Sequence, residues 1–587
     1  MDNASSLPCA VLRSPTDIRY AEAIRAYQGC PTLAVTRGGR IFLGWYAGGS
    51  MEPHMDNYNL LVYSDDGGKS WSPPLLVIPS SRERGTHALD IQLFTDPAGT
   101  LHVMWVQNNA VPQPEQLPDR KPGRPLACVD GWMFDDFRHA EWEVLCRDPD
   151  AAEPEFTEPR FVFPGFMRCK PTFLSENEWL CFAYNQLDDR YHFYRTTDGG
   201  VTYTPGLGSK KLHTYFDESM AYRRTDGSIR MLARCELGQL AESCSYDGGL
   251  TWTETRKSGL DSPSSRFFIA RLPSGRILRV GNDDTAIRRK MTVWLSEDDG
   301  ATWPYRKCLD KRQDLSYPDA DWHDGRILLT FDRGRTTDRE ILFTSFTEQD
   351  ILQQAEIPVS VVSRPAQYPA GPDVVRAILK SRLIVILRDV PKEKILSVAD
   401  ALWDGGVRIL EVTYHADGST DEDTTEKIRL LTRHFGEKML VGAGTVMTRH
   451  QVRLARSAGA VLIISPDTDP DVIRESRTLG MVSIPGAFTP TEIAAAVRAG
   501  ADLVKVFPAA ALGPDYFKAV LAPLAGTHLL AVGGIRPDTV RSWLRAGAEG
   551  FGISSGIVPA DAVARGDYAS ITALAGQFLS EMREEDR

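Results

Sequence analysis

The chain has 587 residues, of which 42% are hydrophobic and 25% charged, and its formal net charge is −11. This length suits two large domains, each with its own core. The negative charge argues against a nucleic-acid partner, and no apolar run is long enough to span a membrane.

The start of the chain lacks a basic segment followed by an apolar one, so no secretory signal is predicted. All nine cysteines fall within residues 1–355, at irregular spacing. An odd number of scattered cysteines is typical of free thiols in a reducing compartment rather than of a disulfide framework. We therefore expect a cytoplasmic protein.

An eight-residue motif occurs four times in this first part. It reads Ser/Thr-x-Asp-x-Gly-x-x-aromatic and covers residues 64–71, 196–203, 245–252 and 296–303. The aspartate can cap a hairpin turn while the glycine supplies the positive φ that the turn needs. The last three copies begin about 50 residues apart, the length of one propeller blade, and the longer first interval leaves room for a blade without the motif. The pattern predicts an all-β, six-bladed propeller within residues 1–355.

The motifs resemble the Asp boxes of sialidase-type propellers. The strings CKPTFLSENEWL, FDESMAYRRTDGSIRMLAR and LSYPDADWHDGRILLTFDRGR are similar to those of sialidase-like glycosyl hydrolases. The resemblance implies Tyr317 as a nucleophile, Glu218 as its partner carboxylate, and Asp56, with Glu52 nearby, as the acid/base group. A tyrosine nucleophile suits an anionic anomeric centre, which would repel a carboxylate.

The arginines depart from that family. Sialidases grip the sugar carboxylate with the arginine of a Tyr-Arg-Ile-Pro string, whereas this chain reads Tyr-Gln-Gly-Cys-Pro over residues 27–31. Arg234 and Arg266 remain as candidates. Glutamine cannot replace a bidentate arginine, so hydrolysis of sialic acid is not expected. The alternative is that Tyr317, Glu218 and both arginines only pack the blades, because Asp boxes also occur in binding propellers.

Residues 356–372 contain four prolines and no sustained periodicity, which predicts a linker. Beyond it, short apolar runs alternate with helical segments that often close on Ala-Gly. The eight runs are 382–389, 408–414, 439–444, 461–466, 481–486, 503–508, 528–534 and 550–555. Continuous Val/Ile/Leu runs are typical of strands buried on both faces. Residues 373–587 are therefore predicted to form a (β/α)8 TIM barrel, with its active site at the carboxyl ends of the strands.

Lys505 lies in the middle of the sixth apolar run. Burial disfavours its ammonium form and lowers its pKa, and the resulting amine can attack a carbonyl to form a Schiff base. The alternative is a lysine that extends its head to solvent. Glu411 and several glycine, proline and serine residues fall at the same ends of other runs, which favours a catalytic site.

The strings LIVILR, EVT, VGAGTV, SIPGAFTPTE, DLVKVFPAAALGPDYFKA and AVGGIRPD resemble class I 2-dehydro-3-deoxy-6-phosphogluconate and -phosphogalactonate aldolases. The resemblance implies that Lys505 forms the Schiff base and that Glu411 is the general base. It implies a keto-acid pocket and a phosphate cradle, with no cofactor or metal and with a homotrimeric assembly. The residues matching substrate-binding positions are Arg388, Thr445 and Pro466 for the acid and Gly533, Gly534 and Ser555 for the phosphate.

Some positions differ from that family. His415 lies near a position where the family often has an arginine, and Ser554 replaces a glycine of the family. Residues 467–469 place two aspartates at the mouth of the barrel. The GPDYFKA and AVGG strings are more similar to the phosphogalactonate branch. These differences leave the sugar epimer and the need for the phosphate open.

Three interpretations follow. In the preferred one, the chain is a bifunctional catabolic enzyme whose propeller hydrolyses a glycoside of a related acidic sugar. In the second, the propeller only binds glycans or organises assembly beside an active aldolase. In the third, the two halves are fused without acting in one reaction sequence.

Overall fold

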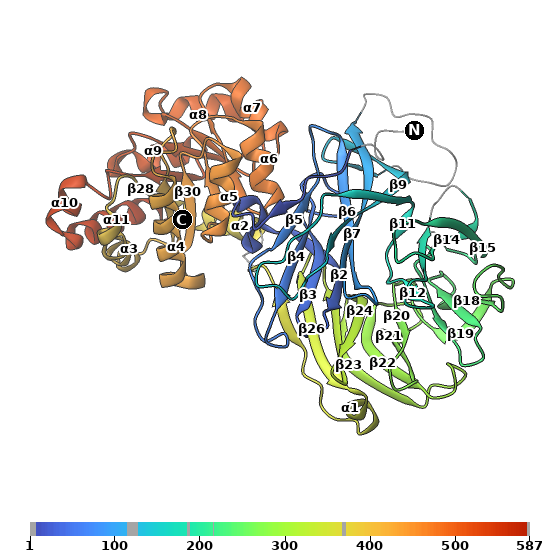
Figure 1. The fold of residues 1–587 in the computed structure, drawn as a ribbon. Helices are drawn as coiled ribbons and strands as arrows, with labels where there is room; N and C mark the ends of the chain where they lie inside the picture. Colours follow the sequence, from blue (N-terminus) through green and yellow to red (C-terminus); the bar gives the residue numbers. More distant parts are fainter. Residues whose placement is uncertain (1–6, 114–126, 185–187, 215, 367–370, 584–587) are drawn as a thin grey trace. The chain divides into compact units, whose positions relative to one another are not determined.

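The structure, a computed structural model, describes residues 7–113, 127–184, 188–214, 216–366 and 371–583. The chain divides into two compact units between Pro365 and Ala366. The first unit consists almost entirely of strands, and the second alternates strands with helices (Figure 1).

Six antiparallel sheets make up the first unit, which confirms the six-bladed propeller. Blade one contains β2 (Tyr27–Val35), β3 (Ile41–Gly48), β4 (Tyr58–Ser64) and β5 (Leu76–Pro79), with β1 (Leu12–Arg13) at its outer edge. Blade two contains β6 (Thr86–Thr95), β7 (Leu101–Pro112), β9 (Trp132–Cys146) and β10 (Arg160–Pro164), and β8 (Ala127–Val129) pairs with β9. Blade three contains β11 (Phe166–Met167), β12 (Thr172–Phe173), β13 (Trp179–Tyr184), β14 (Arg190–Thr196) and β15 (Thr204–Lys210).

The remaining three blades have four strands each. Blade four contains β16 (Ser219–Arg223), β17 (Ile229–Ala233), β18 (Gln239–Ser245) and β19 (Arg256–Asp261). Blade five contains β20 (Phe268–Arg271), β21 (Ile277–Asn282), β22 (Arg289–Ser296) and β23 (Tyr305–Gln313). Blade six contains β24 (Leu315–His323), β25 (Arg326–Arg333), β26 (Glu340–Thr347) and β27 (Ser360–Ser363). The first strands of neighbouring blades contact one another, as β2 does with β6 and β24.

Each Asp box is the turn between the last two strands of its blade in chain order. In blade one, Asp66 accepts hydrogen bonds from the backbone N–H groups of Lys69 and Ser70, both at 2.9 Å. Gly68 donates its N–H to the Ser64 hydroxyl at 2.9 Å and has a φ of 86°. Blades three, four and five repeat this arrangement. Blades two and six lack the motif, and the long first interval predicted this for blade two.

The boundary between the two units differs from the predicted linker. Strand β27 lies within residues 356–372 and pairs with β26, so the sixth blade extends past residue 355. At the other side, helix α2 (Gly371–Ser381) begins before residue 373. The four prolines of this stretch all lie outside β27, which contains only serine and valine, so they do not interrupt its pairing.

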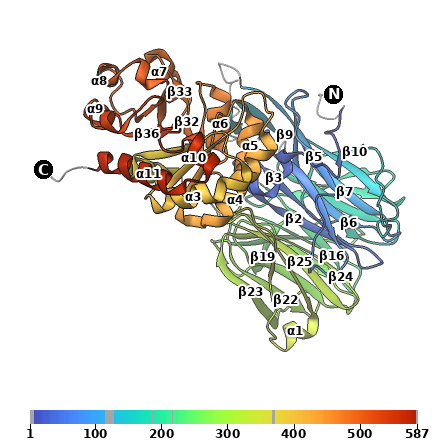
Figure 2. The same ribbon diagram turned by 90° about the vertical axis from the view of Figure 1, so that its left-hand side faces the viewer.

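The second unit is a ring of parallel strands surrounded by helices (Figures 1 and 2). Its strands are β28 (Leu383–Leu387), β29 (Ile409–Thr413), β30 (Leu440–Gly444), β31 (Leu462–Ile464), β32 (Val482–Ile484), β33 (Gly486–Ala487), β34 (Val504–Val506), β35 (Leu529–Val532) and β36 (Gly550–Ile553). Its main helices after α2 are α3 (Ile395–Asp404), α4 (Asp421–Phe435), α5 (Arg449–Ser457), α6 (Pro470–Thr478), α7 (Pro490–Arg498), α8 (Pro514–Leu521), α9 (Val540–Arg545), α10 (Ala560–Arg565) and α11 (Tyr568–Met582).

All eight apolar runs form strands of this ring. The fifth run is interrupted at Pro485, so that β32 pairs with β31 and β33 pairs with β34. Because β32 and β33 are consecutive parts of one run, the interrupted strand joins the two ends of the sheet. The TIM barrel predicted from the sequence is therefore confirmed, with one strand counted twice.

Alternation along the barrel strands sorts the side chains into two layers. One buried cluster, which includes Ile409, Leu503 and Leu530, fills the inside of the ring together with Val374 and Ile378 of α2. The other positions pack outward against the surrounding helices. Two residues further along their strands, the inward positions of β29 and β34 are polar rather than apolar.

Candidate functional sites

Glu411 and Lys505 occupy those two inward positions, at the carboxyl-terminal half of the barrel. Lys505 is 6% exposed and Glu411 is 2% exposed. The Lys505 ammonium lies 4.8 Å from the centre of the Phe507 ring. Within the described residues neither group has an ion-pair partner, and Oε1 of Glu411 is buried without a hydrogen-bond partner.

The two groups shift each other's acidity from a shared buried position. Burial raises the pKa of Glu411, and the charges of Lys505 and Arg388 partly offset this. Burial lowers the pKa of Lys505, Glu411 opposes the shift, and Arg388 adds to it. Desolvation dominates in both cases, so each group is driven toward its neutral form. This produces an amine ready for attack beside a carboxyl group able to exchange protons.

A glycine makes room for the Glu411 side chain. A Cβ at Gly444 would lie 1.7 Å from Oε1 of Glu411, so no larger residue fits while the carboxylate stays in place. Gly444 ends β30, next to β29 in the barrel. Thr445 follows it with a φ of 54°, which turns the chain sharply at the end of the strand.

The structure brings the other predicted aldolase residues to this end of the barrel. Arg388 is exposed directly after β28, and it has no ion-pair partner among the described residues. Pro466 approaches the fifth strand so closely that a Cβ at Gly486 would lie 2.2 Å from its carbonyl oxygen. Thr445 and Pro466 are both half-buried.

The predicted phosphate residues follow β35 and β36. Gly533 and Gly534 both have positive φ angles, 92° and 77°, and a side chain at Gly534 would clash with Ala510. Ser555 is exposed, while the Ser554 carbonyl accepts hydrogen bonds from the next turn of the chain. Glycine-rich turns that expose backbone N–H groups suit an anion.

The positions that differ from the aldolase family also lie at this mouth. His415 contacts Asp389 at 3.0 Å through Nε2, and both side chains are exposed. Burial and the neighbouring Asp469 raise the pKa of Asp467. A wider hollow of about 850 Å³ lies at the amino-terminal ends of the strands and contains none of the predicted site residues.

The propeller has a pocket of about 280 Å³. Its walls come from all six blades and combine arginines with aromatic rings and one carboxylate. The lining residues are Glu52, Pro53, Leu89, His139, Phe166, Arg168, Tyr184, Phe216, Arg234, Arg288, Tyr317 and Arg335. Its volume is at the lower limit of those typical for small-molecule sites.

Tyr317 lines this pocket, and the fully buried Glu218 contacts it from behind the pocket wall. The Tyr317 hydroxyl donates a 2.5 Å hydrogen bond to Oε1 of Glu218. Arg234 contacts the other carboxylate oxygen at 3.1 Å. Burial opposes ionisation of Glu218, but Arg234 and Arg168 outweigh it and lower its pKa to about 2. Glu218 is therefore an anion at neutral pH, positioned to accept the tyrosine proton.

The predicted acid/base region divides into two places. Glu52 lines the pocket and contacts Arg168 at 3.3 Å and Arg335 at 3.5 Å. Asp56 instead pairs with Arg82 at 3.1 Å and does not line the pocket. The chain turns between the two residues, so only the first faces inward. Glu52, rather than Asp56, is the carboxylate available there.

The two predicted arginines are already occupied by carboxylates. Arg234 binds Glu218, and the buried Arg266 contacts Asp319 at 3.3 Å. Sequence reasoning missed Arg288, which lines the pocket and donates to the Ser264 carbonyl at 2.9 Å. In the described part of the chain Arg288 has no carboxylate partner, and burial together with neighbouring arginines lowers its pKa.

Two more pocket arginines were also missed. Arg168 follows β11, and Arg335 follows β25 with its guanidinium 4.1 Å from the centre of the Tyr317 ring. No sequence motif marks either residue. The sequence contained only an indirect indication of these two arginines. Arg168 directly precedes one of the strings that resemble sialidases, and Arg335 is the last residue of another.

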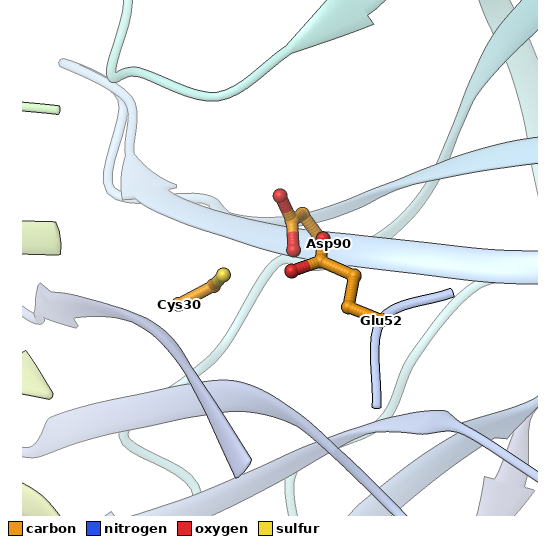
Figure 3. A group of neighbouring side chains, drawn as sticks. All are labelled: Cys30, Glu52 and Asp90. Carbon is orange, nitrogen blue, oxygen red and sulfur yellow. The ribbon is translucent and has the colours of Figure 1, made fainter. Parts of the chain in front are cut away.

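Cys30, Glu52 and Asp90 form a group of potential metal ligands beneath the pocket. Their ligand atoms lie within 4.8 Å of one another, and Figure 3 shows the three side chains converging. Arg168 and Arg335 already neutralise the carboxylates, and burial raises the pKa of the Cys30 thiol far above its usual range. A divalent cation would therefore meet two guanidinium groups and a protonated thiol, so this arrangement fits arginine binding better than metal binding.

Comparison with protein-family models gives matches in both units. Residues 374–574 match the model described as KDPG and KHG aldolase. Residues 135–328 match the BNR repeat-like domain, and residues 62–73 match the BNR/Asp-box repeat. The two resemblances found in the sequence are thus confirmed.

Individual proteins match mainly the C-terminal unit. The 2-dehydro-3-deoxy-6-phosphogalactonate aldolase of Escherichia coli K12 is 35% identical over 177 residues, which cover 30% of this chain and 84% of the relative. The 2-dehydro-3-deoxy-phosphogluconate aldolase of Treponema pallidum is 32% identical over 210 residues, which cover 35% of this chain and 96% of the relative.

Solved structures match each unit separately. The structure titled native KDPGal is 33% identical, with a TM-score of 0.31, and covers 34% of this chain and 94% of that one. The NanB sialidase of Streptococcus pneumoniae is 14% identical, with a TM-score of 0.43, and covers 59% of this chain and 71% of that one. Among the described helices, none combines the length and the apolar character needed to cross a bilayer.

Proposed function

Because the chain belongs, through residues 374–574, to the KDPG and KHG aldolase family, we propose that its barrel cleaves a 2-dehydro-3-deoxy-6-phospho sugar acid to pyruvate and glyceraldehyde 3-phosphate. The observation that carries this proposal is the buried pair of Lys505 and Glu411, in which desolvation lowers the pKa of the amine and raises that of the carboxyl group, so that the carboxylate is a stronger base. A Schiff-base aldolase needs such an amine and such a proton acceptor.

The reaction then runs through Lys505. Its amine attacks the C2 carbonyl of the substrate, water leaves, and the resulting iminium withdraws electrons from the C3–C4 bond. Glu411, or a water held by it, removes the proton of the C4 hydroxyl, and the bond breaks to give glyceraldehyde 3-phosphate and an enamine. The enamine takes up a proton, and hydrolysis releases pyruvate and the free amine.

The substrate-binding roles follow from position. Arg388, which is exposed and without an ion-pair partner in the described residues, is placed to bind an anionic group of the substrate. The turns at Gly533 and Gly534 offer backbone N–H groups to the phosphate. The sequence strings GPDYFKA and AVGG, which resemble the phosphogalactonate branch, favour the galactonate epimer of the substrate.

Pyruvate release from four acids tests this assignment. The acids are 2-dehydro-3-deoxygluconate, 2-dehydro-3-deoxygalactonate and their 6-phosphates, each assayed with wild type and Lys505→Ala. We expect Lys505-dependent release, fastest from the phosphogalactonate. Borohydride should trap pyruvate on wild type and on Glu411→Gln but not on Lys505→Ala. Release that survives in Lys505→Ala would remove the Schiff-base mechanism, and strong inhibition by a chelator would point to a metal.

We further propose that the propeller cleaves a glycosidic bond of an acidic sugar. Tyr317 would act as nucleophile and Glu218 as its base, supported by their 2.5 Å hydrogen bond. Arg288 would bind the acid group, because the other pocket arginines already contact carboxylates. The aldolase substrate is also a sugar acid, so we place both halves in one cytoplasmic catabolic sequence.

The 4-methylumbelliferyl glycosides of glucuronate, galacturonate, N-acetylneuraminate and neutral galactose test the propeller. We expect fluorophore release from an acidic glycoside, little from N-acetylneuraminate, and none with Tyr317→Phe. The competing function is binding without cleavage. Calorimetry with free glucuronate and galacturonate would support that function if either bound while every glycoside stayed intact.

A further inference from the structure

Arg168 touches a different acidic group with each of its guanidinium nitrogens. Nη1 lies 2.5 Å from the Tyr317 hydroxyl and 3.1 Å from Oε1 of Glu218. Nη2 lies 3.3 Å from Oε1 of Glu52. The third nitrogen, Nε, lies 2.7 Å from Oδ2 of Asp90. Nη1 thus has two protein acceptors and Nη2 has one, while Nε meets Asp90 as an ion pair that lacks hydrogen-bond geometry.

We propose that Asp90 is a positioning residue for the tyrosine nucleophile and acts through Arg168. The inference rests on the proposed glycosidase function of the propeller. Asp90 does not line the pocket and is only 3% exposed, so it cannot touch a sugar there. Its one ion pair among the described residues is with Arg168.

The backbone explains why Asp90 reaches this place. The pairing of β6 with β7 shifts register between Leu89 and Ile91, which marks a β-bulge at Asp90. A bulge redirects a side chain away from the regular alternation of the strand. Leu89 thereby lines the pocket while Asp90 lies behind Arg168.

The charge of Arg168 matters to Tyr317. Burial raises the pKa of the Tyr317 phenol, and Arg168 is the strongest influence that lowers it again, whereas Glu218 raises it. A nucleophilic phenolate therefore depends on the guanidinium staying at its hydroxyl. Without Asp90, Nε would lose its anion, and the attraction of Glu52 and Glu218 would decide where the guanidinium lies.

Asp90 is itself sensitive to pH. Burial raises its pKa to about 6, although Arg168 opposes the shift. The other charged or titratable groups that face it are Glu52, Arg335, Cys30, Glu141 and Tyr46. As the pH falls through about 6, protonation weakens the hold on Arg168, so tyrosine-dependent turnover should fall with it.

Kinetics of Asp90→Asn test the inference on the full chain, with whichever methylumbelliferyl glycoside the wild type turns over. We expect kcat to fall about tenfold while KM stays within about twofold. The acidic limb near pH 6 should disappear, and Asp90→Glu should restore part of the rate. Glu242→Gln is the matched control, because it breaks the buried pair with Arg230 in blade four, away from the pocket. An unchanged kcat and pH profile in Asp90→Asn would overturn the inference but leave the glycosidase function intact.

A crystal structure of Asp90→Asn gives a readout that needs no turnover. We expect the Arg168 guanidinium to leave the Tyr317 hydroxyl. A guanidinium that stays in contact overturns the inference whatever the rates show. If Arg168 moves and no glycoside is cleaved by wild type, the proposed glycosidase function fails while the positional link from Asp90 to Tyr317 stands. Asp90→Glu, which keeps the charge, serves as the second crystal if Asp90→Asn does not fold.

Discussion

The barrel and the propeller treat buried charge in opposite ways. In the barrel, Lys505 and Glu411 are buried without ion-pair partners in the described residues, so desolvation controls their pKa values. In the propeller pocket, carboxylates alternate with guanidinium groups, and Glu218 stays ionised although it is fully buried. Desolvation makes neutral, exchangeable groups, whereas pairing fixes charged ones in place. The first suits covalent chemistry at an amine, and the second suits a rigid pocket for an anion.

The largest effect is expected from removing the buried amine of Lys505. Lys505→Ala should lower kcat of the aldolase reaction at least about a thousandfold, because no other described group in the barrel interior can form the imine. Steady-state pyruvate release measures it. Lys518→Ala is the control, since Lys518 is exposed on α8 of the same barrel. Comparable losses in both variants would mean that the fold, and not the amine, had been damaged.

Gly444→Ala should move Glu411 without changing its chemistry. The new Cβ would overlap Oε1, and displacement of a catalytic group by about 1 Å can cost about a hundredfold in rate. We expect kcat to fall while borohydride still traps pyruvate on Lys505. Gly576→Ala on α11 is the matched control, since nothing lies within 4 Å of the added methyl group. Full activity in Gly444→Ala would show that Glu411 need not occupy this position.

The free energy of unfolding, measured at neutral and at acidic pH, distinguishes the ion-paired Glu218 from the unpaired Glu411. The folded pKa of Glu218, about 2, lies below the ordinary value of a glutamate, about 4.3, so its anion stabilises the fold above the unfolded pKa. Glu218→Gln should therefore destabilise the propeller by up to about 3 kcal/mol at pH 7, and this loss should shrink as the pH falls through about 4.3 toward 2. Chemical unfolding at both pH values measures it.

Glu411→Gln should behave in the opposite sense. The folded pKa of Glu411 is raised, so its contribution to stability is present below the unfolded pKa and is lost as the pH rises through the folded pKa. An uncharged amide should thus stabilise the barrel at pH 7 and have little effect in acid. A loss of stability at pH 7 would mean that the carboxylate has a partner that compensates its burial.

Arg288→Lys tests whether the pocket reserves one guanidinium for its ligand. Lysine keeps the charge but loses the planar pair of donors. We expect KM for an acidic glycoside to rise about tenfold with kcat nearly unchanged. Arg289→Lys is the neighbouring control, because Arg289 pairs with Asp284 outside the pocket. Equal KM values for Arg288→Lys and wild type would assign the anion to another group.

Local sequence patterns predicted most of the fold. The eight apolar runs became barrel strands because burial on both faces demands continuous hydrophobic residues, and the Asp boxes became turns because their bonds close within a few residues. Lys505 and Glu411 could be placed for the same reason, as inward positions on regular strands. The family resemblance then supplied their roles.

The propeller pocket could be predicted only in part, because its residues meet across blades that are distant in sequence. Tyr317 and Glu218 were found through resemblance, but Arg168 and Arg288 lie outside any motif. Bulges also break the alternation on which sequence reasoning depends, as at Asp90 and at Tyr317, whose φ is 53°. Which of Asp56 and Glu52 lines the pocket could not be predicted for a related reason, since the turn between them decides which carboxylate faces inward.

The smallest expected effect concerns the Asp boxes, which are charged but neither buried nor part of the pocket. Asp198 accepts hydrogen bonds from the N–H groups of Val201 and Thr202, which lie between the outer strands of blade three. Asp198→Ala should lower the melting temperature of the propeller by a few degrees, and Asp198→Asn, which keeps one acceptor oxygen, should lower it less. Neither change should alter kcat or KM for a glycoside, because no hydrogen bond or ion pair among the described residues joins this turn to a residue that lines the pocket. A change in KM would show that the outer turns of a blade position its inner strand, and the pocket would then depend on the whole blade and not only on the charges that line it.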